Sequence, residues 1–195
     1  MAAKHCFLAK MEAKTQKNPE IVQAGLEDFE ELKVLMRTAN DYSLKLTGVP
    51  QWTAWDRAFG QLEGLLASGQ VFIIRDNEGA IASSISYNFD SEYWGDITQD
   101  NNAIYFYKLM KDPQRSSADD AKQLLMFVAD EAIKSGKQYL RCDTLQELPK
   151  LIRYYEKIGF VQKGDFSIQS VGRRGVILEA SAETVSANLA KMLHG

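Results

Sequence analysis

The residues best placed to do chemistry in this sequence lie in a polar loop near its middle. Residues 102–110 have the β-favouring composition of a strand, and Asp112 and Pro113 end it. Beyond the loop, apolar residues recur at helical spacing, so a helix is expected over 119–135. A short polar loop that joins a strand to a helix N-terminus is a geometry in which backbone N–H groups can hold a phosphate. This loop is therefore a candidate anion site.

The same loop also has an explanation that needs no phosphate. Ser117 can act as the N-cap of the helix, and Asp120 then stands at the third helical position, the arrangement of a capping box. Carboxylates near a helix N-terminus are also stabilised by the positive end of the helix dipole. The helix terminus can thus be satisfied by its own side chains, and the residues alone leave both explanations open.

The composition argues against several classes of protein. The 195 residues carry a net charge of −3, which does not favour a nucleic-acid partner. No window approaches the roughly eighteen consecutive apolar residues that a membrane span needs. Cys6 and Cys142 make no disulfide framework, and His5 and His194 have no partner pattern for a metal site. We therefore expect a cytoplasmic protein without metal, nucleic acid or membrane as partners.

The hydrophobic pattern along the rest of the chain predicts a mixed α/β protein. Strands are expected at 20–24, 70–75, 80–89, 102–110, 138–143, 160–163 and 172–180. Helices are expected over 26–46, after a cap at Thr53, over 119–135, from Pro149 and over 183–193. This order predicts an α/β (α+β) fold with one mixed sheet of about six to seven strands and helices on both faces. Strands 102–110 and 138–143 should run parallel, joined by helix 119–135 as a right-handed crossover. We assign 1–18 to an N-terminal extension and 19–195 to a single domain.

The stretch LRCDTLQELPKLIRYYEKIGF, residues 140–160, carries a resemblance to a known family. It resembles the penultimate strand and following helix of the GNAT superfamily of acyl-CoA-dependent N-acetyltransferases, including the ending Tyr-Glu-Lys-x-Gly-Phe. VFIIRDNEGAIASSIS is similar to the second and third strands of that family. The resemblance covers about residues 20–180, and it implies a GNAT-like fold with acetyl-CoA as co-substrate.

The resemblance also identifies a cofactor loop, and this sequence departs from its pattern. In the family the loop after the fourth strand usually has the pattern Gln/Arg-x-x-Gly-x-Gly/Ala, and its amides receive the pyrophosphate of CoA. Here Ser116, Asp119 and Ala121 stand at those positions, and only Ala121 fits. Asp119 places a carboxylate where a dianion is expected, which costs roughly 3 kcal/mol at ~5 Å and an effective dielectric of 20. The cofactor contacts implied by the resemblance are Leu109, Met110, Arg115, Ser116, Ser117, Ala118, Asp119, Ala121 and Lys122.

Tyr155 is the catalytic candidate that the resemblance implies. In the family this tyrosine commonly stands near the CoA sulfur and protonates the departing thiolate, a role that suits a phenol. The alternative is that Tyr155 only packs between helix and sheet. Trp52 and Trp94 are candidates for the acceptor pocket. Glu92, Asp96 and Asp143 are candidates for the general base by residue type alone.

These observations together predict an N-acyltransferase. It would move an acetyl group from acetyl-CoA to a primary amine of a small molecule or peptide, and the sequence leaves a homodimer open. The competing hypothesis is a GNAT-fold protein without CoA-dependent catalysis that serves as a ligand-binding or interaction module. The altered loop at 116–120 favours the second hypothesis, and Tyr155 favours the first.

Overall fold

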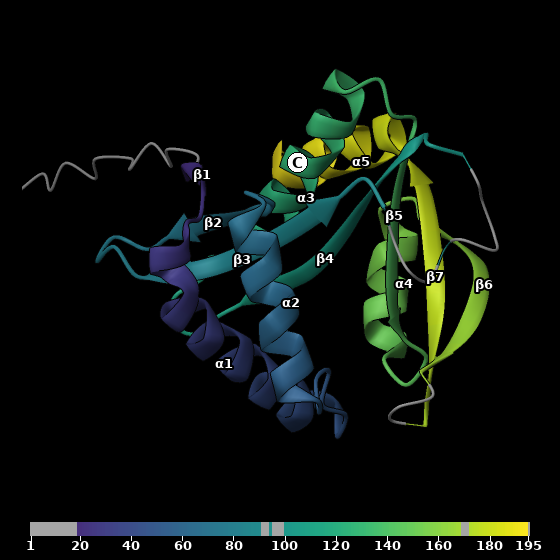
Figure 1. Ribbon diagram of the computed structural model, residues 1–195. Helices are drawn as coiled ribbons and strands as arrows, with labels where there is room; N and C mark the ends of the chain where they lie inside the picture. Colours follow the sequence, from purple (N-terminus) through teal and green to yellow (C-terminus); the bar gives the residue numbers. More distant parts are fainter. Residues whose placement is uncertain (1–18, 91–93, 95–99, 169–171, 195) are drawn as a thin grey trace, which may run out of the picture.

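The computed structural model describes residues 19–90, 94, 100–168 and 172–194, so the expected extension 1–18 lies outside the described residues. Within the described part of the chain, seven strands form one sheet in the order β1-β2-β3-β4-β5-β7-β6. The strands are β1 Ile21–Gln23, β2 Val71–Arg75, β3 Ile81–Asn88, β4 Ala103–Lys111, β5 Tyr139–Leu145, β6 Val161–Ile168 and β7 Arg173–Ser181. The helices are η1 Leu26–Asp28, α1 Phe29–Thr47, α2 Trp55–Ala67, α3 Asp120–Lys134, α4 Pro149–Lys157 and α5 Ala182–His194 (Figure 1). The predicted fold class is confirmed.

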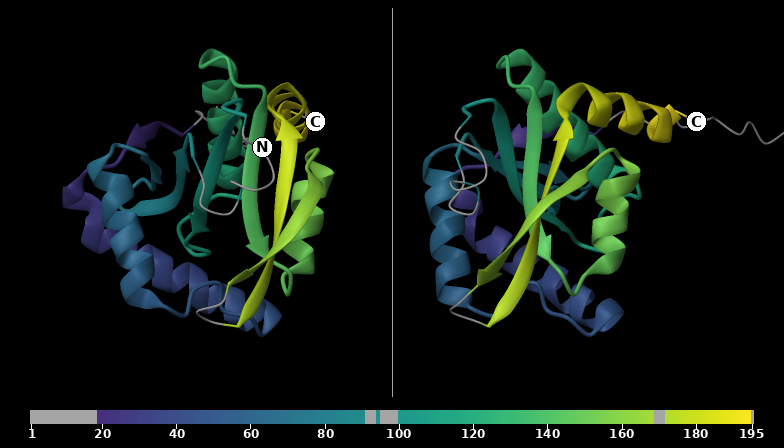
Figure 2. Two further views of the ribbon diagram at one scale, coloured as in Figure 1. Left: turned by 45° about the vertical axis from the view of Figure 1, so that its right-hand side comes forward. Right: turned by 90° about the vertical axis from the view of Figure 1, so that its right-hand side faces the viewer.

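The two faces of the sheet carry separate hydrophobic cores. One core joins α3, α4 and α5 to the sheet and contains Leu124, Leu125 and Val128, which are fully buried. The other joins α1 and α2 to the sheet through residues such as Leu32 and Leu62. The side view in Figure 2 shows α1 and α2 on one side of the sheet and α4 on the other. The alternation of side chains along each strand therefore decides which helices a strand residue faces.

Strands β4 and β5 are parallel neighbours that touch only at their beginnings. Their paired positions are Ala103 with Tyr139, Ile104 with Leu140 and Tyr105 with Arg141. Beyond these pairs β4 stays with β3 and β5 stays with β7, and the two strands diverge (Figure 1). The predicted parallel pairing is confirmed. The divergence leaves the second half of β4 with an edge that no strand of the described chain covers.

A bulge interrupts β4 where the two strands separate. The register between β3 and β4 shifts between Ser84 and Ser86. Lys108 lies opposite this shift with φ +49°, the only positive φ of a non-glycine residue in the described part of the chain. Such a backbone conformation is unfavourable for a lysine by on the order of 1 kcal/mol, and it re-aims the side chains around it.

Most element boundaries agree with the sequence, and the differences have physical causes. β6 ends at Ile168 rather than at 163 because β7 pairs with it through Gly164 and beyond, which local turn propensity does not anticipate. β5 extends to Leu145 for the same reason, since its ladder with β7 continues to Gly175. The expected cap at Thr53 is wrong: the N-cap of α2 is Ala54, and no side chain caps it. None of the helices described is both long and apolar enough to cross a membrane.

Candidate functional site

The divergence of β4 and β5 opens into a cavity of about 790 Å³. It is lined by β4 and β5, by the second half of α2 and the segment before this helix, by α4 and by Phe166 of β6. Because it lies between the two cores, the cavity has two chemically different sides. On the α4 side stand Phe106, Leu109, Cys142, Leu148, Leu151 and Tyr155. On the α2 side stand Gln51, Trp52, Gln61, Ser68, Gln70, Asn88, Asp90, Lys108, Asp143 and Phe166.

Tyr155 lies on the wall of the apolar side. It is only 5% exposed, and its ring packs against Phe106 and Phe160 with centroid separations of 5.8 and 5.5 Å. Pro149 occupies the first turn of α4, and the inner face of this short helix turns Tyr155 toward the sheet. Burial raises the pKa of Tyr155 well above its ordinary value, so the phenol keeps its proton at neutral pH. Tyr155 is thus a packed core residue that carries a protonated phenol at the cavity wall.

The main chain of Leu109 and Met110 lies on the stretch of β4 that β5 leaves uncovered. The side chain of Leu109 lines the cavity, whereas that of Met110 is 1% exposed and packs under α1 and α2. Only the backbone of Met110 can therefore face a ligand. An uncovered strand edge offers N–H and C=O groups to an extended ligand that carries amides.

The loop before α3 satisfies its own helix terminus. The hydroxyl of Ser117 accepts hydrogen bonds from the amides of Asp119 and Asp120, both at 3.2 Å. The carboxylate of Asp120 accepts the amide of Ser117 at 3.2 Å, and it also accepts the hydroxyl of Ser83 at 2.8 Å. The hydrogen bonds expected between Ser117 and the helix terminus are present, but the expected positions are wrong: α3 begins at Asp120, and its N-cap residue is Asp119 rather than Ser117. Two amides that a phosphate could have used are thereby engaged.

Three further residues expected at the cofactor loop are also engaged within the protein. Arg115 lies 2.6 Å from Asp76 in the β2–β3 turn and holds the pKa of that carboxyl below its usual range. The Ser116 hydroxyl donates to the carbonyl of Asp112 at 2.6 Å. The carboxylate of Asp119 lies 2.5 Å from Lys122, so its charge is partly neutralised.

Some donors of this loop remain. Within the described part of the chain, the amides of Ala118, Ala121 and Lys122 have no hydrogen-bond acceptor. The ammonium of Lys111 donates to the carbonyl of Ser117 at 2.6 Å and so lies at the loop as well. The terminus therefore keeps a reduced set of N–H groups and two cations for an anion.

The two tryptophans expected at an acceptor pocket lie in different places. Trp52 lines the cavity, and its amide donates to the side chain of Asn40 at 2.9 Å. Trp94 is 1% exposed, packs against Tyr105 and the guanidinium of Arg141, and is not part of the cavity wall. Trp94 belongs to a buried cluster in which Arg141 also pairs with Glu179 and Asp100 at 2.8 Å.

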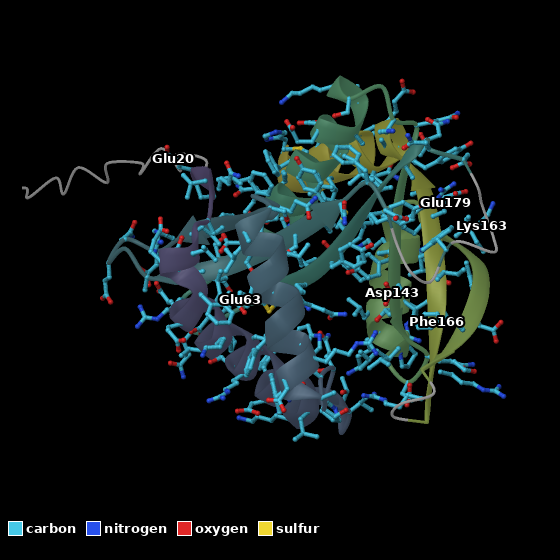
Figure 3. All side chains as sticks on the ribbon, viewed as in Figure 1. Glu20, Glu63, Asp143, Lys163, Phe166 and Glu179 are labelled. Carbon is cyan, nitrogen blue, oxygen red and sulfur yellow. The ribbon has the colours of Figure 1, made fainter. Side chains whose placement is uncertain are left out.

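Of the three candidates for a general base, Glu92 and Asp96 lie outside the described residues. Asp143 lies on β5 and lines the cavity, and it is labelled beside the gap between the diverging strands in Figure 3. Cys142, its neighbour in the strand, points to the α4 side, where burial raises the pKa of its thiol well above the ordinary value. Asp143 therefore stands on the opposite, polar side.

Lys108 is a cavity residue that sequence analysis missed. Its amine lies 3.5 Å from the side-chain oxygen of Gln61 on α2. Burial lowers the pKa of Lys108 to about 8, while the charge of Asp143 acts in the opposite direction. In the sequence it is one polar position in an alternating strand, and no local signal separates it from a solvated lysine. The described residues contain no group of three histidine, cysteine or acidic side chains that could hold a metal ion.

Similarity to known proteins is found among solved structures. No family model matches the sequence, and no curated protein matches it. Solved structures do match. A GNAT-family acetyltransferase from Listeria monocytogenes shares 20% identity with a TM-score of 0.64, covering 84% of this chain and 94% of that one.

Two other matches extend this comparison. The ribosomal-protein-alanine N-acetyltransferase of Brucella melitensis shares 16% identity with a TM-score of 0.57, covering 83% of this chain and 99% of that one. The protein yncA of Salmonella typhimurium was solved with its cofactor acetyl-CoA. It shares 15% identity with a TM-score of 0.58, covering 85% of this chain and 95% of that one. The chain therefore has the fold of the GNAT acetyltransferases.

Proposed function

We propose that the protein is an N-acyltransferase that moves an acetyl group from acetyl-CoA to a primary amine of a small molecule or peptide. The observation that carries this proposal is the uncovered edge of β4 beside a cavity that also contains a buried phenol, Tyr155. The fold shared with GNAT acetyltransferases supports it.

The residues present fit acetyl-CoA in most of its length. The backbone of Leu109 and Met110 would pair with the amides of the pantetheine arm, and the cavity is large enough for the arm and an acceptor. The pyrophosphate would meet the amides of Ala118, Ala121 and Lys122. Arg115, Ser116 and Ser117 would support the loop, because their side chains are held within the protein. The co-substrate supplies an activated acyl group as a thioester.

The chemistry assigns one role to each side of the cavity. The acceptor nitrogen attacks the acyl carbon from the α2 side, its C–N bond forms, and the C–S bond breaks. Tyr155 gives its proton to the departing thiolate and regains one from solvent. Asp143 receives the proton that the nitrogen loses and passes it to solvent. The products are an amide and a free thiol, so atoms and protons balance.

Titration calorimetry with acetyl-CoA and with CoA tests this proposal first. We expect saturable binding of both, followed by thiol release in the presence of primary amines. A protein that binds neither compound would contradict the proposed function.

A second candidate function is a ligand-binding or interaction module with no CoA-dependent chemistry. The observation that favours it is the capping of α3 by Ser117 and Asp120, which uses donors that a pyrophosphate would need. Absence of CoA binding by a folded protein would place this candidate first.

A further inference from the structure

The polar side of the cavity contains a charge that the proposed transfer does not use. Lys108 is the only lysine or arginine among the described residues that line the cavity. The bulge in β4 holds its backbone at φ +49°. Its side chain extends toward α2, where the amine meets the oxygen of Gln61 at 3.5 Å. The backbone conformation of Lys108 thus places its ammonium group beside α2.

This ammonium lacks the close partner that neighbouring lysines have. Lys122 lies 2.5 Å from a carboxylate, and Lys111 donates to a carbonyl at 2.6 Å. Lys108 has no carboxylate within 4.0 Å in the described part of the chain, and its one contact with Gln61 is long. A partly buried cation with no anion in direct contact is costly, and an anion bound beside it would lower that cost.

An opposite charge stands on the facing wall. Asp143 comes from β5, which diverges from β4, and both residues line the same cavity. Figure 3 shows Asp143 on the side of β5 that borders this gap. The two charges are not joined in a salt bridge. A small molecule that carries both an ammonium and a carboxylate can place its carboxylate beside Lys108 and its ammonium toward the wall that carries Asp143.

We propose that the acceptor is an amino acid or a similar small zwitterion, whose carboxylate Lys108 binds while Asp143 attracts its amino group. This inference rests on the proposed function and specifies its substrate class. The side chains of Gln61 and Gln70 lie on the same wall and make it polar. Lys108 is thus a specificity-determining residue of the acceptor side.

A carboxylate could also arrive on the acyl group, as in succinyl-CoA. The position of Lys108 favours the acceptor, because its side chain contacts α2 whereas Tyr155 marks the thiol on the α4 side. An experiment can separate the two sources.

The test compares acceptors that differ in the carboxylate. Thiol release from acetyl-CoA is measured with each of the twenty standard amino acids, with the corresponding amino-acid amides and with simple alkylamines. We expect at least one amino acid to exceed its amide in kcat/KM by on the order of 10- to 100-fold, the size of a charge-assisted contact. Amides or alkylamines that react as well as every amino acid would overturn the inference.

Variants then assign the preference to Lys108. Lys108→Met should remove the preference by lowering the amino-acid rates alone, and Lys108→Arg should retain part of it. Lys134→Met, at the exposed end of α3, is the matched control and should change neither rate. An equal loss for amino acids and amides in Lys108→Met would show that the lysine acts in some other way. If Lys108→Met lowered only the rate measured with succinyl-CoA as the acyl donor, the carboxylate bound by Lys108 would belong to the acyl group and not to the acceptor.

A binding measurement keeps the inference falsifiable if turnover is slow. In protein labelled with ¹⁵N at its lysine side chains, N-acetyl amino acids added with CoA should raise the pKa of Lys108 above about 8, and N-acetyl amino-acid amides should not. The acidic groups on the same wall are Asp90 and Asp143. No shift with any N-acetyl amino acid would overturn the inference. Failure of CoA itself to bind would instead refute the proposed function.

Discussion

Tyr155 belongs both to the hydrophobic core and to the wall of the cavity. It packs in the main core against Phe106 and Phe160, and it also borders the cavity. Burial raises the pKa of its phenol, so the proton is in place at neutral pH and can be given to a thiolate that forms in contact with it. Core packing and proton donation are therefore compatible at this position.

Replacement of Tyr155 by phenylalanine isolates the hydroxyl. Tyr155→Phe should lower turnover about 10²- to 10⁴-fold while acetyl-CoA affinity stays nearly unchanged, because the ring and its packing are retained. Steady-state rates and calorimetry with the same preparations measure the two quantities. Tyr154→Phe removes the neighbouring buried hydroxyl and serves as the control. An unaltered rate in Tyr155→Phe, with chemistry limiting, would remove the phenol from the mechanism.

The carboxylate of Asp119 lies in the loop that would bind the pyrophosphate of CoA, and it is paired with Lys122. The backbone at Asp119 is right-handed, with φ −98° and ψ −14°, so its conformation does not require a glycine. Its carboxylate repels a phosphate directly and also occupies the ammonium of Lys122. Both effects depend on charge rather than on bulk.

Asp119→Asn should therefore tighten CoA binding by roughly 1–2 kcal/mol, more at low than at high ionic strength. Asp119→Gly should add little to this gain, and it should cost stability through backbone entropy. Calorimetry at two salt concentrations gives the comparison. Glu131→Gln removes the equivalent acidic partner of Lys134 at the other end of α3 and should have no effect on CoA. Unchanged affinity in both Asp119 variants would mean that the loop does not contact phosphate.

At the scale of elements, the loop before α3 uses for helix capping the same N–H groups that a bound anion would need. Ser117 takes the amides of Asp119 and Asp120, which leaves a reduced set for a ligand. The loop is thus biased toward stability of the free protein.

Ser117→Ala should lower the free energy of unfolding by about 1 kcal/mol, the usual value of a side chain that accepts hydrogen bonds from amides at a helix N-terminus. The same change should leave CoA affinity equal or higher, since two amides are released. Ser135→Ala, at the C-cap of the same helix, is the matched control, with an expected change within about 0.5 kcal/mol. Denaturant unfolding and calorimetry measure both effects. A stable Ser117→Ala protein with weaker CoA binding would contradict this account of the loop.

At the scale of the whole molecule, the sheet holds together two halves that meet only briefly. The half from β1 to β4 and the half from β5 to β7 are joined by three paired positions between β4 and β5 and by packing of the helices. A ligand that pairs with the uncovered edge of β4 would bridge the opening between them (Figure 1).

Acetyl-CoA should therefore raise the midpoint of thermal unfolding in a concentration-dependent way. At 100 times its Kd the expected stabilisation is about 2.7 kcal/mol, which corresponds to a shift of roughly 5–10 °C for a domain of this size. Differential scanning calorimetry with acetyl-CoA, and with adenosine diphosphate as a control that lacks the pantetheine arm, measures it. An equal shift with both compounds would locate binding at the phosphate loop alone.

The sequence by itself determined the kinds and order of the elements, because hydrophobic periodicity and turn residues act over a few positions. The capping of α3 was predictable for the same reason, since Ser117 and Asp120 are three residues apart. The parallel pairing of β4 with β5 followed from the strand–helix–strand order. In the candidate site, Tyr155 was indicated by a resemblance, and Asp143 was named by residue type alone.

Tertiary structure alone decided which of the remaining residues share the cavity. Trp52 and Trp94 look alike in the sequence, yet only Trp52 reaches the wall, while Trp94 packs against Arg141. Arg115 turns away to Asp76, which lies 39 residues earlier in the chain. The bulge that directs Lys108 toward α2 depends on the register between β3 and β4. These features arise from contacts between distant segments, and no pattern over a few neighbouring residues can encode where such segments will meet.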